Sequence, residues 1–169
     1  MNNQPASAFS IRAATDADWA GLWYILEPVF RAGDTYAVDP AIDEAIAREY
    51  WLRTPQSCQV AVDARGQIVG TYYLKTNQPG PGSHVCNCGY IVSASARGQG
   101  VATALCRHSL TLARELGYQA MQYNFVAATN AGAVRLWQSL GFDIVGTLPG
   151  AFRHPTAGLV DAHVMYQGL

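Results

Sequence analysis

Apolar and polar residues alternate with the period of a strand near the N-terminus and then with the period of a helix. Phe9–Ala13 alternates apolar and polar side chains, which predicts a half-buried strand. Thr15 and Asp18 then form a T-x-x-D start signal for a first helix. Its apolar face follows at spacings of three and four: Trp19, Leu22, Trp23, Leu26 and Phe30. Asp39-Pro40 predicts the start of a second helix that ends near Arg53.

Downstream of the second helix, strands and helices continue to alternate. Strands are expected at 59–62, 68–74, 84–92, 121–125, 142–147 and 160–166, and helices from Gly100 to Leu116 and from 130 to 140. The turn at 63–66 reads as the connection of a hairpin. This order predicts an α/β fold, a mixed sheet with helices on both faces. Residues 1–8 read as a loose N-terminal leader, and 9–169 as a single domain.

Composition excludes several classes of protein. With 169 residues the chain has the length of one ordinary domain. Eleven basic residues face 12 acidic ones without a basic run, so no nucleic acid partner is expected. No apolar stretch reaches the ~20 residues of a membrane helix, so no membrane is expected. The cysteines are few and scattered, which favours reduced thiols in a cytoplasmic protein, and their C-x-C pair predicts no metal site.

The most informative stretch is the turn between the strand at 84–92 and the following helix. Gly98 and Gly100 let the backbone approach a ligand, and the helix start exposes N–H groups that attract an anion. Arg97 can add charged donors. An ordinary glycine-rich connection would look the same. A P-loop is excluded, because the only lysine, Lys75, lies on an earlier strand, and G-x-G-x-x-G fails at Thr103. A pyrophosphate cradle of another kind remains.

Two motifs in this region resemble the signatures of a known family. Arg97-Gly98-Gln99-Gly100-Val101-Ala102 resembles the R/Q-x-x-G-x-G/A signature of the GNAT superfamily, the acyl-CoA-dependent N-acetyltransferases. The run from Asn130 to Phe142 resembles the second signature, N-x-x-A-x-x-L-Y-x-x-L-G-F. The order of elements matches as well, from roughly Phe9 to Tyr166. The resemblance implies the GNAT acyl-CoA N-acyltransferase fold, whose middle strands splay apart.

The resemblance also implies acetyl-CoA as cosubstrate and assigns residues to it. Those residues would be Ile91, Val92, Arg97, Gly98, Gln99, Gly100, Val101, Ala102 and Asn130. Amides of the turn would hold the pyrophosphate, and the main chain of Ile91 and Val92 would bond to pantetheine as an added strand does. Asn130 would lie beside the pantetheine arm. It also fits a plain helix N-cap, and both roles can hold at once.

Trp137 departs from the family pattern. The family often places a tyrosine there, and that tyrosine protonates the leaving thiolate. An indole N–H is no proton source near neutral pH, so the usual general acid is missing. The thiolate then leaves unassisted or takes a proton from water, with Tyr123 and Tyr36 as weaker substitutes. No side chain is named as general base; water or a backbone carbonyl takes the proton of the amine, and the N–H of Val92 polarises the thioester carbonyl.

Asn87 and Asn124 are the candidate catalytic residues. Each lies in an apolar strand stretch, where an amide without partners is costly. Either they cap backbone groups left open by the splay, or they line the cleft, orient the amine and bond to a carboxylate or oxyanion. With the tail at 146–155 they look similar to the GNAT branch that acetylates proline analogues such as azetidine-2-carboxylate, and phosphinothricin acetyltransferases are a more distant likeness. His154 and the loop at 31–36, with Asp34, are kept as substrate-pocket candidates.

The function implied by the resemblance is transfer of an acetyl group from acetyl-CoA to the amine of a small molecule. The acceptor would be an amino acid or proline analogue, and transfer would be direct, within a ternary complex. A homodimer is compatible with this picture. The alternatives are a protein N-terminal or lysine acetyltransferase and a non-catalytic acyl-CoA sensor.

Overall fold

A computed structural model describes residues 9–169, so the leader expected at 1–8 lies outside the described residues. Within this part of the chain, seven strands form one sheet in the order β1-β2-β3-β4-β5-β7-β6. The strands are β1 (Phe9–Ala13), β2 (Ser57–Asp63), β3 (Ile68–Thr76), β4 (Val85–Val92), β5 (Ala120–Ala127), β6 (Asp143–His154) and β7 (Gly158–Gly168). The α-helices are α1 (Trp19–Ala32), α2 (Glu44–Arg48), α3 (Val101–Glu115) and α4 (Ala131–Ser139).

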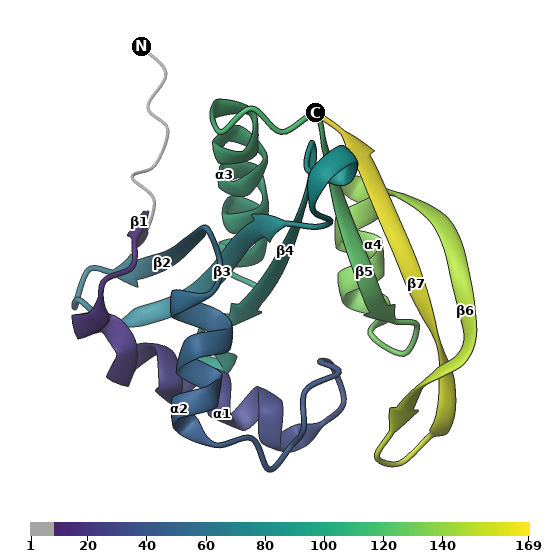
Figure 1. Ribbon diagram of the computed structural model, residues 1–169. Coiled ribbons are helices and arrows are strands. Elements are labelled where there is room, and N and C mark those ends of the chain that lie inside the picture. Colours follow the sequence, from purple (N-terminus) through teal and green to yellow (C-terminus); the bar gives the residue numbers. More distant parts are fainter. Residues whose placement is uncertain (1–8) are drawn as a thin grey trace.

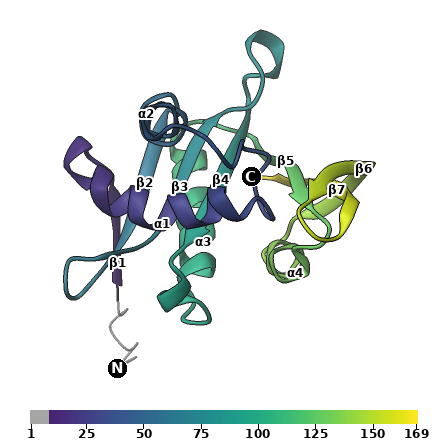
Figure 2. The ribbon, with the colours of Figure 1, turned by 90° about the horizontal axis from the view of Figure 1, so that it is seen from below.

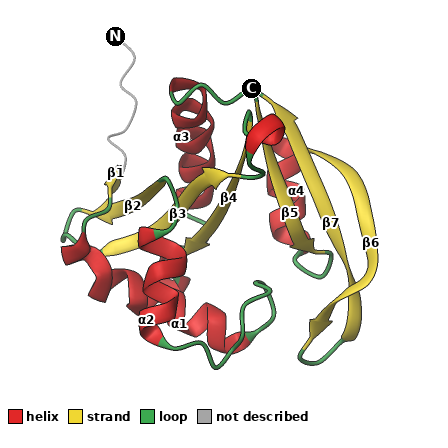
Figure 3. Ribbon diagram, viewed as in Figure 1, coloured by secondary structure: helices red, strands yellow, loops and turns green. Residues whose placement is uncertain are grey.

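The helices cover both faces of the sheet, as the sequence predicts (Figures 1, 2 and 3). α1 and α2 pack on one face, and α3 and α4 on the other. Alternation along β3 supplies both cores, since Tyr72 is buried against α3 while its neighbour Tyr73 is buried on the α1 side. The start of α1 is fixed by the predicted capping box, in which the carboxylate of Asp18 accepts from the Thr15 N–H at 2.8 Å.

The middle of the sheet opens between β4 and β5. These two strands run parallel and pair only at Val85↔Ala120 and Cys86↔Met121. Beyond that point they separate (Figure 1), while the other neighbouring strands pair antiparallel over much of their length. The sheet is therefore mixed, and its middle strands splay apart as the family resemblance implies.

The second helix begins later than the sequence predicts. Asp39 caps a turn, where its carboxylate accepts from the Ala41 N–H, and Asp43 is the N-cap of α2. Both aspartates satisfy free N–H groups, so the local signal at Asp39-Pro40 could not distinguish them. The following turn, η2 (Glu49–Arg53), is a π-helix, in which the Thr54 N–H donates to the Glu49 carbonyl at 2.8 Å.

β6 is longer than the expected strand at 142–147. It pairs with β7 as far as His154↔Gly158, and the register shifts between Leu148 and Phe152. This irregularity accommodates the glycine- and proline-rich stretch that reads as a loop in the sequence. The carboxylate of Asp161 on β7 accepts from the Gly150 N–H at 2.9 Å and holds the irregular segment in the hairpin.

Candidate active site

The turn before α3 has the geometry of an anion cradle. Gly98 and Gly100 have φ of 73° and 78°, values that favour glycine, and a Cβ at either position would meet nothing within 4 Å. Gly100 is the N-cap of α3, so the first N–H groups of that helix have no intrahelical acceptor. Gln99 stiffens the turn by donating to the Ser95 carbonyl at 3.0 Å. Arg97, Val101 and Ala102 line a cleft of about 400 Å³ at this turn.

The main chain of β4 continues this cleft into the sheet. The Ser93 N–H donates to the Val69 carbonyl across the β3–β4 pair. Because backbone groups alternate in direction along an antiparallel strand, those of Val92 and Tyr90 point toward the gap. Those of Ile91 point toward β3, and the Ile91 side chain is buried near the α1 face. Ile91 therefore lines the cleft while its main-chain groups bond to β3, whereas Val92 offers its main-chain groups to a ligand.

A larger cleft of about 980 Å³ lies between α1, the end of β4 and α4. The glycine turn before α3 contributes Arg97 and Gly98, and α1 contributes Ile25 and Val29. Asn130 lines this cleft and is also the N-cap of α4, with its carbonyl oxygen accepting from the Ala133 N–H at 3.4 Å. The N-cap role that the sequence allows for Asn130 is therefore confirmed, and its role beside the pantetheine arm stays a prediction.

A second cavity of about 290 Å³ lies at the gap itself. Its walls come from β3, β4, β5, η2, α4 and the loop after α1. It shares with the larger cleft Thr35, Tyr90, Asn130, Ala133 and Trp137. The two cavities therefore meet where β4 and β5 separate, one long enough for an extended ligand and the other small.

Asn87 bridges the separating strands. Its side chain is 6% exposed, and its Nδ2 donates to the Gln122 carbonyl on β5 at 2.9 Å. Its Oδ1 accepts from the Tyr73 hydroxyl at 3.4 Å. Asn87 thus satisfies a backbone group that the splay leaves open, and it also lines the small cavity.

Asn124 lies in a different environment from the one its sequence suggests. It is exposed rather than enclosed in an apolar strand interior, because β5 has separated from β4 at this point. Its amide forms side-chain hydrogen bonds with Gln122 at 2.9 Å and with Asn77 at 2.7 Å. Asn124 lines the small cavity but caps no backbone group there.

Trp137 fills the position between the two cavities. Its ring packs against Tyr90 and Tyr123, with ring centroids 4.9 and 5.3 Å apart. The Tyr123 hydroxyl bonds to that of Tyr90 at 3.0 Å, and the Tyr36 hydroxyl donates to the Tyr90 carbonyl at 2.8 Å. Burial raises the pKa of Tyr36, Tyr90 and Tyr123, so these phenols stay protonated near neutral pH. They can donate hydrogen bonds, and they are not bases.

Three residues that sequence reasoning did not select also line the small cavity. Lys75 and Tyr73 lie two apart on β3, on the same face, and Tyr50 reaches them from η2. The Lys75 ammonium lies 5.4 Å from the Tyr73 ring centroid and 5.9 Å from that of Tyr50. The period-two pattern of β3 was the available signal, because it places Tyr73 and Lys75 on one face of the sheet.

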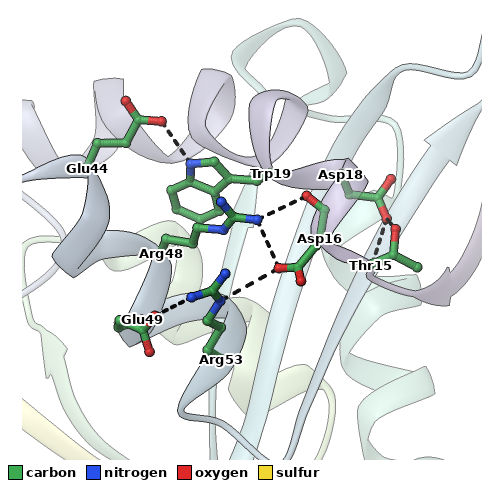
Figure 4. A network of polar contacts seen from close by, with 8 residues as sticks. All are labelled: Thr15, Asp16, Asp18, Trp19, Glu44, Arg48, Glu49 and Arg53. Atoms are coloured by element: carbon green, nitrogen blue, oxygen red, sulfur yellow. Dashed lines mark hydrogen bonds and ion pairs between the residues drawn. The ribbon is translucent and has the colours of Figure 1, made fainter.

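A polar network holds η2 against the start of α1 (Figure 4). Arg48 donates to the Asp16 carboxylate at 2.9 Å and lies over the ring of Trp19. The Trp19 indole donates to Glu44 at 2.8 Å, so both ends of α2 are attached to α1. This attachment fixes the segment that carries Tyr50 into the small cavity.

Other sequence candidates lie elsewhere. His154 lines none of the three cavities; its Nδ1 accepts from the backbone of Ala157 in the β6–β7 turn. Asp34 lines the larger cleft and not the small one. Across residues 9–169, no group of three or more histidine, cysteine or acidic side chains could hold a metal ion. No helix in the same range is long and apolar enough to cross a membrane.

The mixed sheet, its central gap and the glycine turn before α3 define an acyl-CoA-dependent transferase. Residues 19–142 match the acetyltransferase (GNAT) family, and the chain belongs to that family. It is an acetyl-CoA-dependent N-acetyltransferase.

Three known proteins illustrate the relationship. A GCN5-related N-acetyltransferase from Kribbella flavida is 45% identical, with a TM-score of 0.91 over 96% of this chain and 98% of that one. N-acetyltransferase aca1 from Schizosaccharomyces pombe is 29% identical over 85% of this chain and 76% of its own length. A phosphinothricin acetyltransferase from Sinorhizobium meliloti in complex with acetyl-CoA has a TM-score of 0.84 at 20% identity, over 96% of this chain and 89% of that one. That last likeness concerns the fold.

Proposed function

We propose that this enzyme acetylates the amine of a small molecule, an amino acid or proline analogue, by direct transfer in a ternary complex. The observation that carries the proposal is the small cavity of about 290 Å³, which meets the larger cleft where β4 and β5 separate. That volume lies near the lower end of the range for small-molecule sites, roughly 300–1,000 Å³. The Schizosaccharomyces pombe relative is named an N-acetyltransferase and the Sinorhizobium meliloti protein a phosphinothricin acetyltransferase, which supports the activity and leaves the acceptor to experiment.

The larger cleft fits the coenzyme. Positive φ at Gly98 and Gly100 turns backbone N–H groups outward, and the space where a Cβ would stand is open. The turn from Arg97 to Ala102 would hold the pyrophosphate, with Gln99 bracing it and Val101 beginning the helix. Bound there, acetyl-CoA supplies an activated acetyl thioester. Val92 would bind the pantetheine amides through its main chain, with Ile91 and Asn130 as neighbouring walls.

The acceptor would occupy the small cavity. In the reaction a nitrogen–carbon bond forms as the carbon–sulfur bond breaks, and the proton of the amine ends on the thiol. The chain's own part is to align the two substrates and to place donors at the reacting carbonyl, with the N–H of Val92 pointing into the gap. Asn87 and Asn124 would orient the amine from opposite strands of the gap. Water or a backbone carbonyl would take the proton, since no carboxylate or histidine lines this cavity.

We further propose a single N-acetyltransferase domain at 9–169, working in the cytoplasm. Four buried, free cysteines support a reducing compartment.

A homodimer is supported by exposed apolar side chains on the β6–β7 hairpin: Val145, Leu148 and Leu159. Sedimentation of the protein with and without Leu159→Lys tests the dimer, which predicts a halved mass for the variant.

A thiol-release assay with acetyl-CoA and a panel of acceptors tests the proposed function. Turnover of free amino acids and proline analogues is expected, and turnover of peptides alone would overturn the proposal.

Asn124→Ala should lower kcat more than it lowers coenzyme affinity, because Asn124 lies on the acceptor side of the gap. Unchanged kinetics would remove Asn124 from the site. Tyr123→Phe with full activity would exclude Tyr123 as the acid.

A further inference from the structure

The small cavity is lined by one basic side chain, that of Lys75. Among the described residues that line this cavity there is no aspartate, glutamate, arginine or histidine. Lys75 takes part in none of the ion pairs found within residues 9–169. Asp34 lines the larger cleft and not the small cavity. The cavity therefore has a net positive charge that no protein carboxylate neutralises.

The surrounding elements hold the Lys75 ammonium at the wall of the cavity. Lys75 is half-buried on β3 and pairs with Asn87 on β4. Its Nζ lies within 6 Å of the centroids of Tyr73 and Tyr50, a distance at which an ammonium is attracted to an aromatic face. These rings limit the freedom of a long, flexible side chain, so less ordering remains to be done when an anion binds.

The polar neighbours of Lys75 bond to one another and to the main chain, which leaves the ammonium as the donor for a ligand. The Tyr73 hydroxyl points toward Asn87, which lies directly opposite Lys75. Gly89 makes this arrangement possible, because a Cβ there would lie 2.6 Å from the Tyr73 ring. The Lys75 ammonium has three N–H donors for a carboxylate, which has about four lone-pair sites. An ammonium group at the same place would be repelled by Lys75.

We propose that Lys75 is a specificity-determining residue that binds a carboxylate on the acceptor, a proposal that rests on the small-molecule function above. The positive charge at one end of the cavity directs the acidic group of the acceptor there. The amine is then directed away from it, toward the gap where the two clefts meet. The enzyme accordingly prefers α-amino acids, cyclic or acyclic, to amines of the same shape without an acidic group.

The test compares acceptors that differ only in the acidic group. L-Proline with L-prolinamide, and L-alanine with L-alaninamide, are assayed by thiol release, with each rate corrected for the fraction of free amine. The wild-type enzyme is expected to have the higher kcat/KM for the acid of each pair. In Lys75→Met the preference should fall about 10- to 100-fold, the range for loss of a charged hydrogen bond. The loss should appear mainly in KM, and Lys75→Arg should retain part of the preference.

Two controls separate charge recognition from general damage. Arg65→Met removes a positive charge from the exposed β2–β3 turn and should leave the preference unchanged. Calorimetry with CoA should give the same affinity for Lys75→Met as for the wild type. An unchanged preference in Lys75→Met would overturn the role of Lys75 while the small-molecule function stands. Turnover of peptides alone by the wild type would overturn the proposed function, and this inference with it.

Discussion

Gly66 and Gly100 share a backbone conformation and differ in what surrounds them. Both have φ of 78°, and at neither would a Cβ meet another atom within 4 Å. Gly66 closes the exposed β2–β3 turn, whereas Gly100 begins α3 at the edge of the coenzyme cleft. A side chain carries the same backbone strain at both positions, so the pair isolates the effect of filling the cleft.

Gly100→Trp should abolish coenzyme binding in a folded protein. An indole at Gly100 would project into the space above the turn amides and exclude the pyrophosphate. We expect CoA affinity measured by calorimetry to fall at least ~100-fold, about 2.8 kcal/mol. In thermal melts, Gly66→Trp should destabilise the fold about as much as Gly100→Trp does, and it should leave CoA affinity unchanged. Equal CoA affinity in both variants would show that the pyrophosphate lies elsewhere.

Gly89→Ala should impair the acceptor cavity through Tyr73. The added methyl would lie 2.6 Å from a ring carbon of Tyr73, and Trp51 blocks retreat on the other side with its ring centroid at 4.9 Å. Overpacking of this kind costs about 1–3 kcal/mol of unfolding free energy. We expect that loss in denaturant melts, together with a raised KM for the acceptor and unchanged CoA affinity. Gly146→Ala, in open space on β6, is the matched control and should cost less than ~1 kcal/mol.

At the scale of elements, the π-helix η2 shows how a local irregularity serves the site. An extra residue in this turn rotates the chain after α2, and the segment carries Tyr50 and Trp51 toward β3. Its anchor is the Arg48–Asp16 contact, which joins it to the start of α1 (Figure 4). The acceptor cavity therefore depends on a contact far from its own walls.

Arg48→Met should loosen η2 more than Arg53→Met does. The Arg48 side chain is 30% exposed and lies over Trp19, whereas the Arg53 side chain is 49% exposed and pairs mainly with exposed Glu49. We expect Arg48→Met to cost about 1 kcal/mol and Arg53→Met less than ~0.5 kcal/mol in denaturant melts. Hydrogen exchange at the amides of η2 should accelerate in Arg48→Met, and the acceptor KM should rise. Equal exchange in the two variants would contradict the anchoring role of Arg48.

Elements defined by local signals were predicted from the sequence, and those defined by distant contacts were not. The strand at Phe9–Ala13 and the glycine turn before α3 follow from residues that are neighbours in the chain. The extension of β6 to His154 depends on pairing with β7 and on Asp161, which the sequence of 146–155 does not reveal. His154 was accordingly kept as a substrate-pocket candidate, and it is the last residue of β6 and lines none of the three cavities described.

At the scale of the whole molecule, the gap in the sheet brings distant segments together. The geometry of the glycine turn before α3 could be predicted because it depends on the backbone of one short segment. The small cavity, where we propose that the acceptor binds, could not be predicted. Its walls come from β3, β4, β5, η2, α4 and a loop, which are distant from one another in the sequence. Lys75 served in the sequence only to exclude a P-loop, and its position beside Asn87 emerges from the β3–β4 register. Asn124 was expected in an apolar interior, and the separation of β5 from β4 exposes it.

The residues that line the small cavity predict how the rate of acetyl transfer depends on pH. Burial raises the pKa of the tyrosines and of Cys88 in the acceptor cavity, which moves their titration further above neutrality. No histidine or carboxylate lines the cavity, so no protein base with a pKa near 7 stands beside the acceptor. The deprotonation that limits the reaction is then that of the acceptor amine itself, which must be neutral to attack.

We therefore expect log kcat/KM to rise with a slope of about one per pH unit from pH 6 up to the pKa of the acceptor amine. The midpoint should move with the acceptor, lower for L-prolinamide than for L-proline, because the amide has the less basic nitrogen. Rates from stopped assays over pH 6–11 at saturating acetyl-CoA provide the measurement, with circular dichroism confirming the fold at each pH. A midpoint that stays the same for both acceptors would reveal a general base in the protein, and would place it outside the cavity described for residues 9–169.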